Sequence, residues 1–182
     1  VTGKDAKVFN ESGRPVFWLG ADQPKIVLLA HLDTVWPIGS FNPIWKVEGD
    51  IAFGPGTFDM KAGFLQALYA IKDIALDQIA LIATTDEETG SQTSKDLIKK
   101  VSTTSSAVLV LEASINGKVK TGRKGTAMYR VIVNGRAAHA GLEPEKGINA
   151  TVEIANQISK IVALENKELG TTVVPTTLLS GT

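Results

Sequence analysis

Three apolar segments of the chain run directly into side chains that can bind a metal ion or transfer a proton. Residues 26–30 lead into His31 and Asp33, residues 79–83 into Asp86, Glu87 and Glu88, and residues 107–111 into Glu112. Carboxylates that lie close together repel one another, so a cluster of them needs a cation to hold it. One imidazole with several carboxylates suits a borderline divalent metal, and zinc fits best.

Taken singly, these residues also have plain structural interpretations. His31 could be a hydrogen-bonded core histidine, although an aspartate such as Asp33 nearby is typical of a metal-binding imidazole. A further acid, Asp59, could cap the N-terminus of a helix. Glu87 and Glu88 could form a solvated turn, yet neighbours in an extended segment point in opposite directions, so one could bind a metal while the other acts as a base. The coincidence of three strand ends favours a shared site.

The segments that carry these residues predict an α/β fold. The apolar runs at 26–30, 79–83 and 107–111 are typical of strands that are covered on both faces. Helical periodicity begins at Met60, and a second short helix is predicted at residues 94–101. Strands that alternate with helices indicate a mostly parallel sheet, in which ligands bind beyond the carboxyl ends of the strands. The candidate residues should therefore share one cleft.

The composition changes around residues 118–124, where we place a domain boundary. Beyond it, residues 126–133 and 171–179 read as strands, and residues 149–162 as an amphipathic helix with Asn149 as its N-cap. His139 lies in this part of the chain, where its plain interpretation is a histidine in a surface loop.

The composition narrows the functional classes. Among 182 residues, 19 basic side chains balance 19 acidic ones, which gives no sign of a nucleic-acid or anionic-membrane partner. The absence of cysteine excludes thiolate ligands. No apolar run approaches the roughly 18 residues that a membrane span needs. No signal peptide is visible, which favours a cytoplasmic location, although the start at Val1 suggests that the N-terminus is missing.

Five motifs in order resemble a known enzyme family. They are HLDTV at 31–35, GPGTFDMKAG at 54–63, DEETGS at 86–91, AHAG at 138–141 and GINA at 147–150. They are similar to those of the aminoacylase and glutamate carboxypeptidase family of co-catalytic dizinc peptidases, which includes acetylornithine deacetylase and succinyl-diaminopimelate desuccinylase. Trp36-Pro37 most resembles the glutamate carboxypeptidase branch.

The resemblance implies a three-layer αβα domain with a mostly parallel sheet, followed by an α+β ferredoxin-like lid. Residues 1–122 would be the N-terminal part of the catalytic domain. Residues 123–182 would be the first half of the lid, through which the enzyme would form a homodimer.

The resemblance also implies a role for each candidate residue. His31, Asp59 and Glu112 would bind the first zinc, Asp59 and Glu88 the second, Asp33 would orient His31, Glu87 would be the general base, and His139 would reach into the partner's active site to steady the oxyanion. In this family the peptide bond after the bridging aspartate is typically cis.

The implied activity is zinc-dependent hydrolysis of an amide bond in a peptide or N-acyl amino acid, possibly releasing a C-terminal glutamate. Cobalt or manganese could replace zinc. The chain has only two histidines, His31 and His139, whereas the family's last zinc ligand is a further histidine near the C-terminus. Glu112 is followed by Ala113, where the branch usually has proline. The chain therefore resembles an internal fragment that binds one zinc or none and has low activity.

Two other functions stay open. The parent protein could be a non-catalytic paralogue that binds N-acyl amino acids or peptides, and the missing downstream sequence would then lack the final histidine. Alternatively, its lid half could serve mainly as a dimerisation module.

Overall fold

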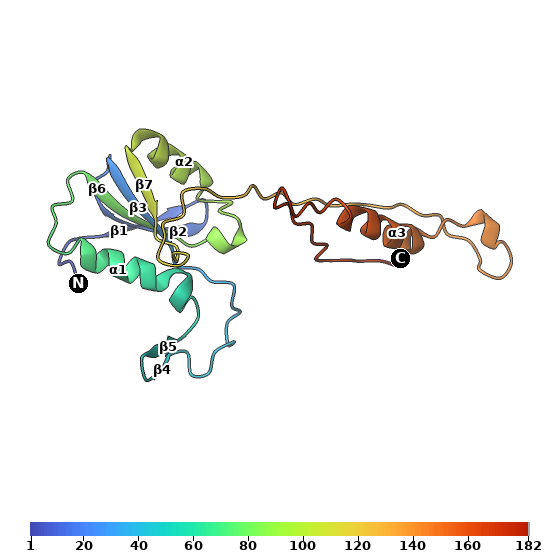
Figure 1. Ribbon diagram of the computed structural model, residues 1–182, viewed down its shortest axis with the longest axis horizontal. Coiled ribbons are helices and arrows are strands. Elements are labelled where there is room, and N and C mark those ends of the chain that lie inside the picture. The colour runs from blue at the N-terminus through green and yellow to red at the C-terminus, as the bar shows by residue number, and fades with distance from the viewer. Residues whose placement is uncertain (182) are drawn as a thin grey trace. The chain divides into compact units, whose positions relative to one another are not determined.

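The computed structural model describes residues 1–181, and the chain divides into two compact units (Figure 1). The first unit is Val1–Gly122 and the second is Arg123–Thr182.

A five-stranded sheet forms the centre of the first unit. Its strands, in the spatial order β1-β2-β6-β3-β7, are β1 (Lys7–Glu11), β2 (Arg14–Gly20), β6 (Ile79–Thr84), β3 (Ile26–His31) and β7 (Ala107–Val110). The neighbours β6, β3 and β7 run parallel, and β2 and β1 continue the sheet antiparallel. His31 lies opposite Thr84, and Leu29 lies opposite Val110. This register brings the carboxyl ends of the three parallel strands to one edge.

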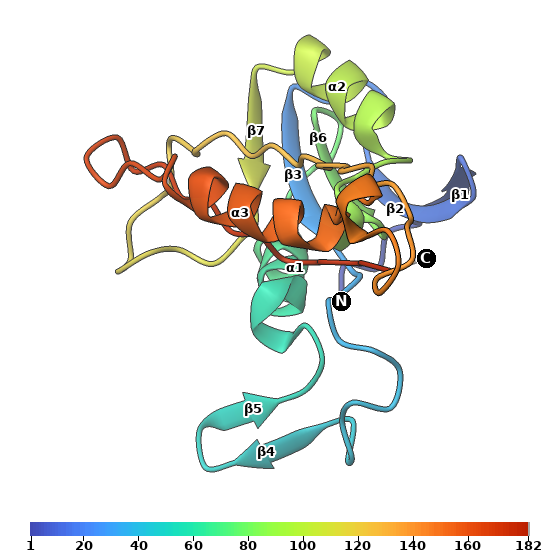
Figure 2. The same ribbon diagram turned by 90° about the vertical axis from the view of Figure 1, so that its right-hand side faces the viewer.

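Helices cover both faces of this sheet. The helices α1 (Ala62–Ala70) and α2 (Lys95–Thr104) lie on opposite sides (Figure 1; Figure 2). On one side Val101 packs with Val27 and Ile82, and on the other Ala67 packs with Leu81. The α/β fold predicted from the apolar runs is confirmed.

One strand differs from its prediction. Residues 107–111 were expected to be buried on both faces, but β7 is the edge strand, with Leu109 52% and Val110 57% exposed. The reason is that β7 pairs only with β3. An apolar run alone does not reveal how many neighbours its strand will have.

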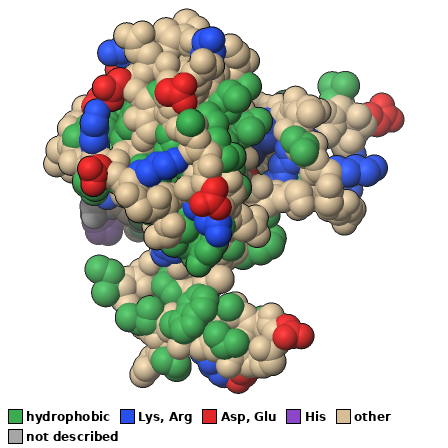
Figure 3. All heavy atoms as spheres, turned by 90° about the vertical axis from the view of Figure 1, so that its left-hand side faces the viewer, with side chains coloured by type: hydrophobic (Ala, Val, Ile, Leu, Met, Phe, Trp, Pro, Cys, Tyr) green, Lys and Arg blue, Asp and Glu red, His purple; other side chains and the backbone are tan. Residues whose placement is uncertain are grey.

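A small hairpin projects from the loop between β3 and α1. It consists of β4 (Lys46–Glu48) and β5 (Ile51–Phe53), which form their own two-stranded sheet. Figure 3 shows hydrophobic side chains gathered over this projection. In this part of the chain, Trp45 and Ile51 are more than half exposed. The loop also contains a cis bond between Asn42 and Pro43.

The second unit contains the helix α3 (Ala150–Val162). Asn149 caps it as predicted, because its side-chain oxygen accepts a hydrogen bond from the Val152 N–H at 3.1 Å. The strands expected at 126–133 and 171–179 do not form ladders in the described structure, where only isolated bridges occur in this unit. A β-rich sequence becomes a strand only when another strand pairs with it, and these segments have no such partner here.

Across residues 1–181, no helix is both long enough and apolar enough to cross a membrane.

Candidate metal centre

His31, the last residue of β3, is at the centre of the site. Its side chain is only 2% exposed. Nδ1 lies 3.1 Å from the backbone carbonyl oxygen of Asp33. Since a carbonyl oxygen only accepts hydrogen bonds, Nδ1 carries the proton and donates it. In the neutral ring this leaves the Nε2 lone pair free for a metal, which is the arrangement of most metal-binding histidines.

Three carboxylates surround that lone pair. The distances from His31 Nε2 are 3.1 Å to Asp59 Oδ1, 3.5 Å to Glu112 Oε1 and 3.9 Å to Glu87 Oε2. Glu87 and Glu112 come after β6 and β7, and Asp59 lies in the turn before α1, so three separate segments meet at the end of the sheet. A cation is the group that such a convergence of negative charge suits best.

The pKa values of the cluster reflect this crowding. Burial raises the pKa of Glu112, and the negative charge of Asp59 raises it further. Burial opposes ionisation of His31, but its hydrogen bond to the Asp33 carbonyl and the charge of Glu87 outweigh that effect and raise the pKa. The imidazole and the carboxylates are therefore electrostatically coupled.

Asp59 lies in a distorted turn, Thr57–Lys61, where Asp59 and Met60 have non-helical backbone angles. Since α1 begins only at Ala62 and its N-cap residue is Lys61, Asp59 does not cap this helix. The peptide bond between Asp59 and Met60 is cis.

A Cβ on Gly63 would lie 2.1 Å from the carbonyl oxygen of Leu111, so glycine allows α1 to approach the segment that leads into Glu112.

Asp33 links His31 to the Glu87–Thr89 turn. Its carbonyl accepts the His31 Nδ1–H, while its carboxylate Oδ2 accepts the Glu88 backbone N–H at 2.9 Å. The carboxylate itself lies 3.5 Å from Nδ1, so the backbone carbonyl is the nearer partner of the ring. Asp33 thus positions two candidate ligands.

Asp86 is a buried residue that sequence reasoning left without a role. Its Oδ2 accepts three hydrogen bonds, from the Thr93 N–H and hydroxyl at 2.7 Å each and from the Ser94 N–H at 3.0 Å. Although burial favours the neutral acid, the hydrogen bonds from Ser94 and Thr93 outweigh it and hold the pKa of Asp86 at about 2. Asp86 therefore fixes the loop that presents Glu87 and Glu88. The sequence signal for this role was the pair Thr93-Ser94 directly before α2, because a buried aspartate can accept hydrogen bonds from such residues.

His139, in the second unit, has the opposite ring arrangement. Its Nδ1 accepts hydrogen bonds from the backbone N–H groups of Gly141 at 3.1 Å and Leu142 at 3.2 Å. Nδ1 is therefore unprotonated in the neutral ring, and Nε2 carries the hydrogen. The Nε2–H of His139 is therefore available to donate a hydrogen bond.

Two groups of side chains in the described chain have donor atoms close enough to share a metal ion. One is His31, Glu87 and Glu112, the other is His31, Asp59 and Glu88, and within each group the donor atoms lie within 4.8 Å of one another. Both groups depend on the single Nε2 of His31, because Nδ1 is already engaged. The residues fit one metal ion with a nitrogen ligand better than two.

The α/β fold thus places a candidate metal cluster beyond the carboxyl ends of its parallel strands. The chain belongs to peptidase family M20/M25/M40, which matches residues 27–177. This confirms the family that the sequence motifs indicated.

Individual relatives show how much of such a protein the chain represents. Carboxypeptidase G2 from Pseudomonas sp. (strain RS-16) is 34% identical over 157 residues, which are 81% of this chain and 38% of that protein. Acetylornithine deacetylase from Aliivibrio fischeri (strain MJ11) is 32% identical and is matched over 41% of its length. The chain thus spans about two fifths of these relatives.

A solved structure shares the fold. A tripeptidase from Staphylococcus aureus subsp. aureus Mu50 superposes with a TM-score of 0.54 at 23% sequence identity, covering 88% of this chain and 48% of that one.

Proposed function

We propose that the protein containing this chain is a zinc-dependent hydrolase of amide bonds in peptides or N-acyl amino acids. The observation that carries the proposal is the lone pair of His31 Nε2, which faces three carboxylates while Nδ1 is held by a backbone carbonyl. Family membership supports the same activity.

The donor set fits a zinc ion. The proposed ligands His31, Asp59 and Glu112 would supply one nitrogen and two carboxylates, the usual number of protein ligands in a catalytic zinc site. Asp59 and Glu112 each have donor atoms close to His31, although they belong to different ones of the two groups described above. Asp59 is the carboxylate nearest to Nε2, which supports its assignment as a ligand, and Glu87 is the farthest of the three at 3.9 Å. When bound, zinc lowers the pKa of water and polarises a carbonyl.

The chain's own groups would move the protons. Glu87, whose side chain is 48% exposed, can reach a water molecule at the cluster, accept its proton and return that proton to the leaving amine. His139 would donate its Nε2–H to the oxyanion that develops on the attacked carbonyl. The products are a carboxylic acid and an amine, which is a free amino acid when the substrate is an N-acyl amino acid.

The finer assignments belong to the same proposal. Residues 1–122 form part of the catalytic domain, and residues 123–182 form half of a lid through which the parent protein dimerises. Glu88 contributes to a second zinc site that this chain does not complete, so the chain alone has low activity. The resemblance of Trp36-Pro37 to the glutamate carboxypeptidase branch favours a substrate with a C-terminal glutamate.

The test is hydrolysis of N-acetyl and N-benzoyl glutamate by the complete protein with and without zinc. Glu87→Gln should lower kcat by about 10²–10⁴-fold without loss of zinc, because a general base contributes that much. The matched control is Asp96→Asn, which removes an exposed carboxylate on α2. Zinc-independent activity, or full activity in Glu87→Gln, would contradict the proposal. Binding without hydrolysis would indicate the non-catalytic alternative.

A further inference from the structure

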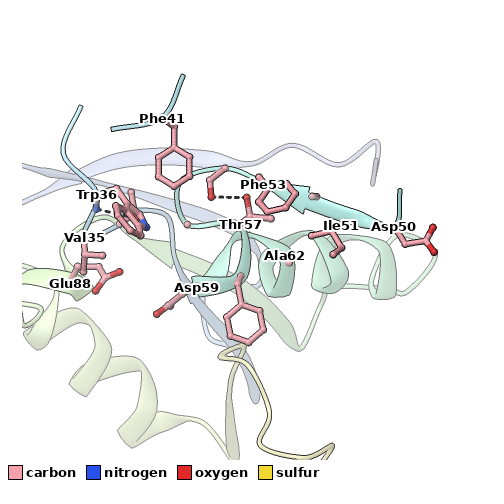
Figure 4. Close-up of a pocket in the computed structure, with 15 residues that line it drawn as sticks. Val35, Trp36, Phe41, Asp50, Ile51, Phe53, Thr57, Asp59, Ala62 and Glu88 are labelled. Atoms are coloured by element: carbon pink, nitrogen blue, oxygen red, sulfur yellow. Dashed lines mark hydrogen bonds between the residues drawn. The ribbon is translucent and has the colours of Figure 1, made fainter. Parts of the chain in front are cut away.

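A pocket of about 600 Å³ lies directly beside the candidate metal centre, within the first unit. Asp59 and Glu88, both candidate ligands, form part of its wall (Figure 4). The remaining wall comes mainly from the loop after β3 and from β5. A volume of this size is typical of sites for small molecules, which range over about 300–1,000 Å³.

Aromatic side chains dominate this wall. Trp36 and Phe41 pack edge to face, with ring centroids 5.2 Å apart and an interplanar angle of 89°. Phe53 follows from β5, and Phe58 directly precedes Asp59. Trp36 and Phe58 are 52% and 77% exposed, so their rings retain free surface that an apolar group could cover.

The charges near the pocket disfavour an anionic occupant. No lysine, arginine or histidine belongs to the wall. The wall does include acidic side chains, and Asp50 and Glu88 lie on opposite sides of the pocket (Figure 4). Two cations lie next to the wall, and the Lys61 ammonium, beside Gly56, is outnumbered by the wall carboxylates of Asp50, Asp59 and Glu88. Lys46 pairs with Glu48 at 2.5 Å and lies 5.8 Å from the centre of the Phe53 ring, and Lys61 donates to the carbonyl oxygen of Pro55 at 2.7 Å.

We infer that this pocket binds an uncharged apolar group, aromatic or branched, on the acyl side of the scissile amide. The inference rests on the proposed function. Asp59 and Glu88 belong both to the pocket wall and to the candidate metal centre. A group bound in the pocket therefore belongs to the substrate, either on the acyl side or on the leaving amine side of the scissile amide. The leaving half of an N-acyl amino acid carries a carboxylate, which this wall cannot neutralise. The acyl half is therefore the occupant.

The decisive experiment compares three glutamate derivatives that differ only in the acyl group: N-benzoyl, N-acetyl and N-(4-aminobutanoyl). In the complete protein, we expect kcat/KM to be at least about tenfold higher for the benzoyl than for the acetyl substrate, because extra apolar contacts discriminate by about 10–200-fold. Trp36→Ala and Phe53→Ala should each lower the benzoyl value about tenfold and leave the acetyl value within about twofold. Tyr69→Ala, which removes an exposed aromatic ring of α1 outside the pocket, should change neither value.

Equal losses for the benzoyl and acetyl substrates in Trp36→Ala, or a preference for the cationic aminobutanoyl substrate, would overturn the inference. Binding provides a separate readout, measured by isothermal titration of metal-free protein with N-benzoyl and N-acetyl glutamate. Hydrolysis of none of the three substrates would reject the proposed function. In that case the apolar pocket would still be supported if the protein bound N-benzoyl glutamate more tightly than N-acetyl glutamate and Phe53→Ala abolished this preference. Equal binding of the two compounds would reject the apolar pocket.

Discussion

The two histidines of the chain, His31 and His139, use Nδ1 in opposite ways: one donates a hydrogen bond from it and the other accepts hydrogen bonds at it. In the first unit, buried His31 donates from Nδ1 to the Asp33 carbonyl and keeps the Nε2 lone pair. In the second unit, exposed His139 accepts backbone N–H groups at Nδ1 and keeps a hydrogen on Nε2. The backbone group that meets Nδ1 thus decides whether Nε2 is a ligand or a donor.

This contrast makes the two histidines separable by experiment. A change at His31 should act through the metal, whereas a change at His139 should act through the stabilisation of developing charge. Asp33 and Asp86, which hold the segments around His31, should have smaller effects than either histidine.

The largest effect is expected for His31→Ala. In the complete protein, activity should fall by roughly 10³-fold or more, because the several kcal/mol that a metal supplies to the reaction are lost with it. Zinc titration should show that the unaltered 182-residue chain binds one ion tightly and that the variant binds it much more weakly. Two tightly held ions per chain, or undiminished affinity in the variant, would contradict the assignment.

His139→Ala should lower kcat by about 10²–10³-fold, the effect of removing one oxyanion donor. Zinc content and affinity should stay unchanged, in contrast to His31→Ala. His139→Gln keeps a side-chain N–H and should recover part of the loss. A variant with normal kcat, or one that loses zinc, would remove the distinction between the two histidines.

Asp33→Ala should weaken zinc binding by about 10–100-fold, as expected for a residue that supports metal ligands. The carbonyl that holds His31 Nδ1 belongs to the backbone and survives the substitution, so the loss should come from the release of the Glu88 N–H. Asp33→Asn retains an acceptor oxygen and should bind zinc more tightly than Asp33→Ala. Equal affinity for both variants would show that Glu88 does not depend on this contact.

Asp86→Ala should lower the free energy of unfolding by about 1–3 kcal/mol, because the buried N–H groups of Thr93 and Ser94 would lose their acceptor. Urea denaturation of the metal-free chain measures this change. Asp96→Ala, at an exposed position of α2, should stay within about 0.5 kcal/mol of the unaltered chain. A similar value for both variants would mean that Asp86 does not fix its loop.

The features that the sequence predicted well were those with strong local signals. The runs at 26–30 and 79–83 are strongly apolar, and both form central strands. The motif spacing indicated the family. Because the carboxyl ends of parallel strands lie at the same end of a sheet, the sequence alone grouped His31, Glu87 and Glu112. Asn149 was predictable because a cap acts within one helical turn.

The features that escaped prediction depend on contacts between distant segments. Residues 126–133 have the composition of a strand, but composition does not supply a pairing partner. Asp86 acts through Thr93 and Ser94, and its neighbours Glu87 and Glu88 gave the stronger signal. The rings of Trp36 and Phe53 are 17 positions apart, and only the folded loop places both in one wall.

The pairing of β3 between β6 and β7 has a consequence for insertions and deletions. Successive residues of a strand advance by about 3.3 Å and point to opposite faces. Loss of one residue within 26–30 would therefore shift His31 along the strand and turn its ring away from Asp59 and Glu112, or force the whole sheet into a new register. A residue lost from the exposed positions 72–75, between α1 and β6, would mainly shorten a surface connection. Changes of chain length in this protein are thus tolerated between the strands and incompatible with the metal centre inside them.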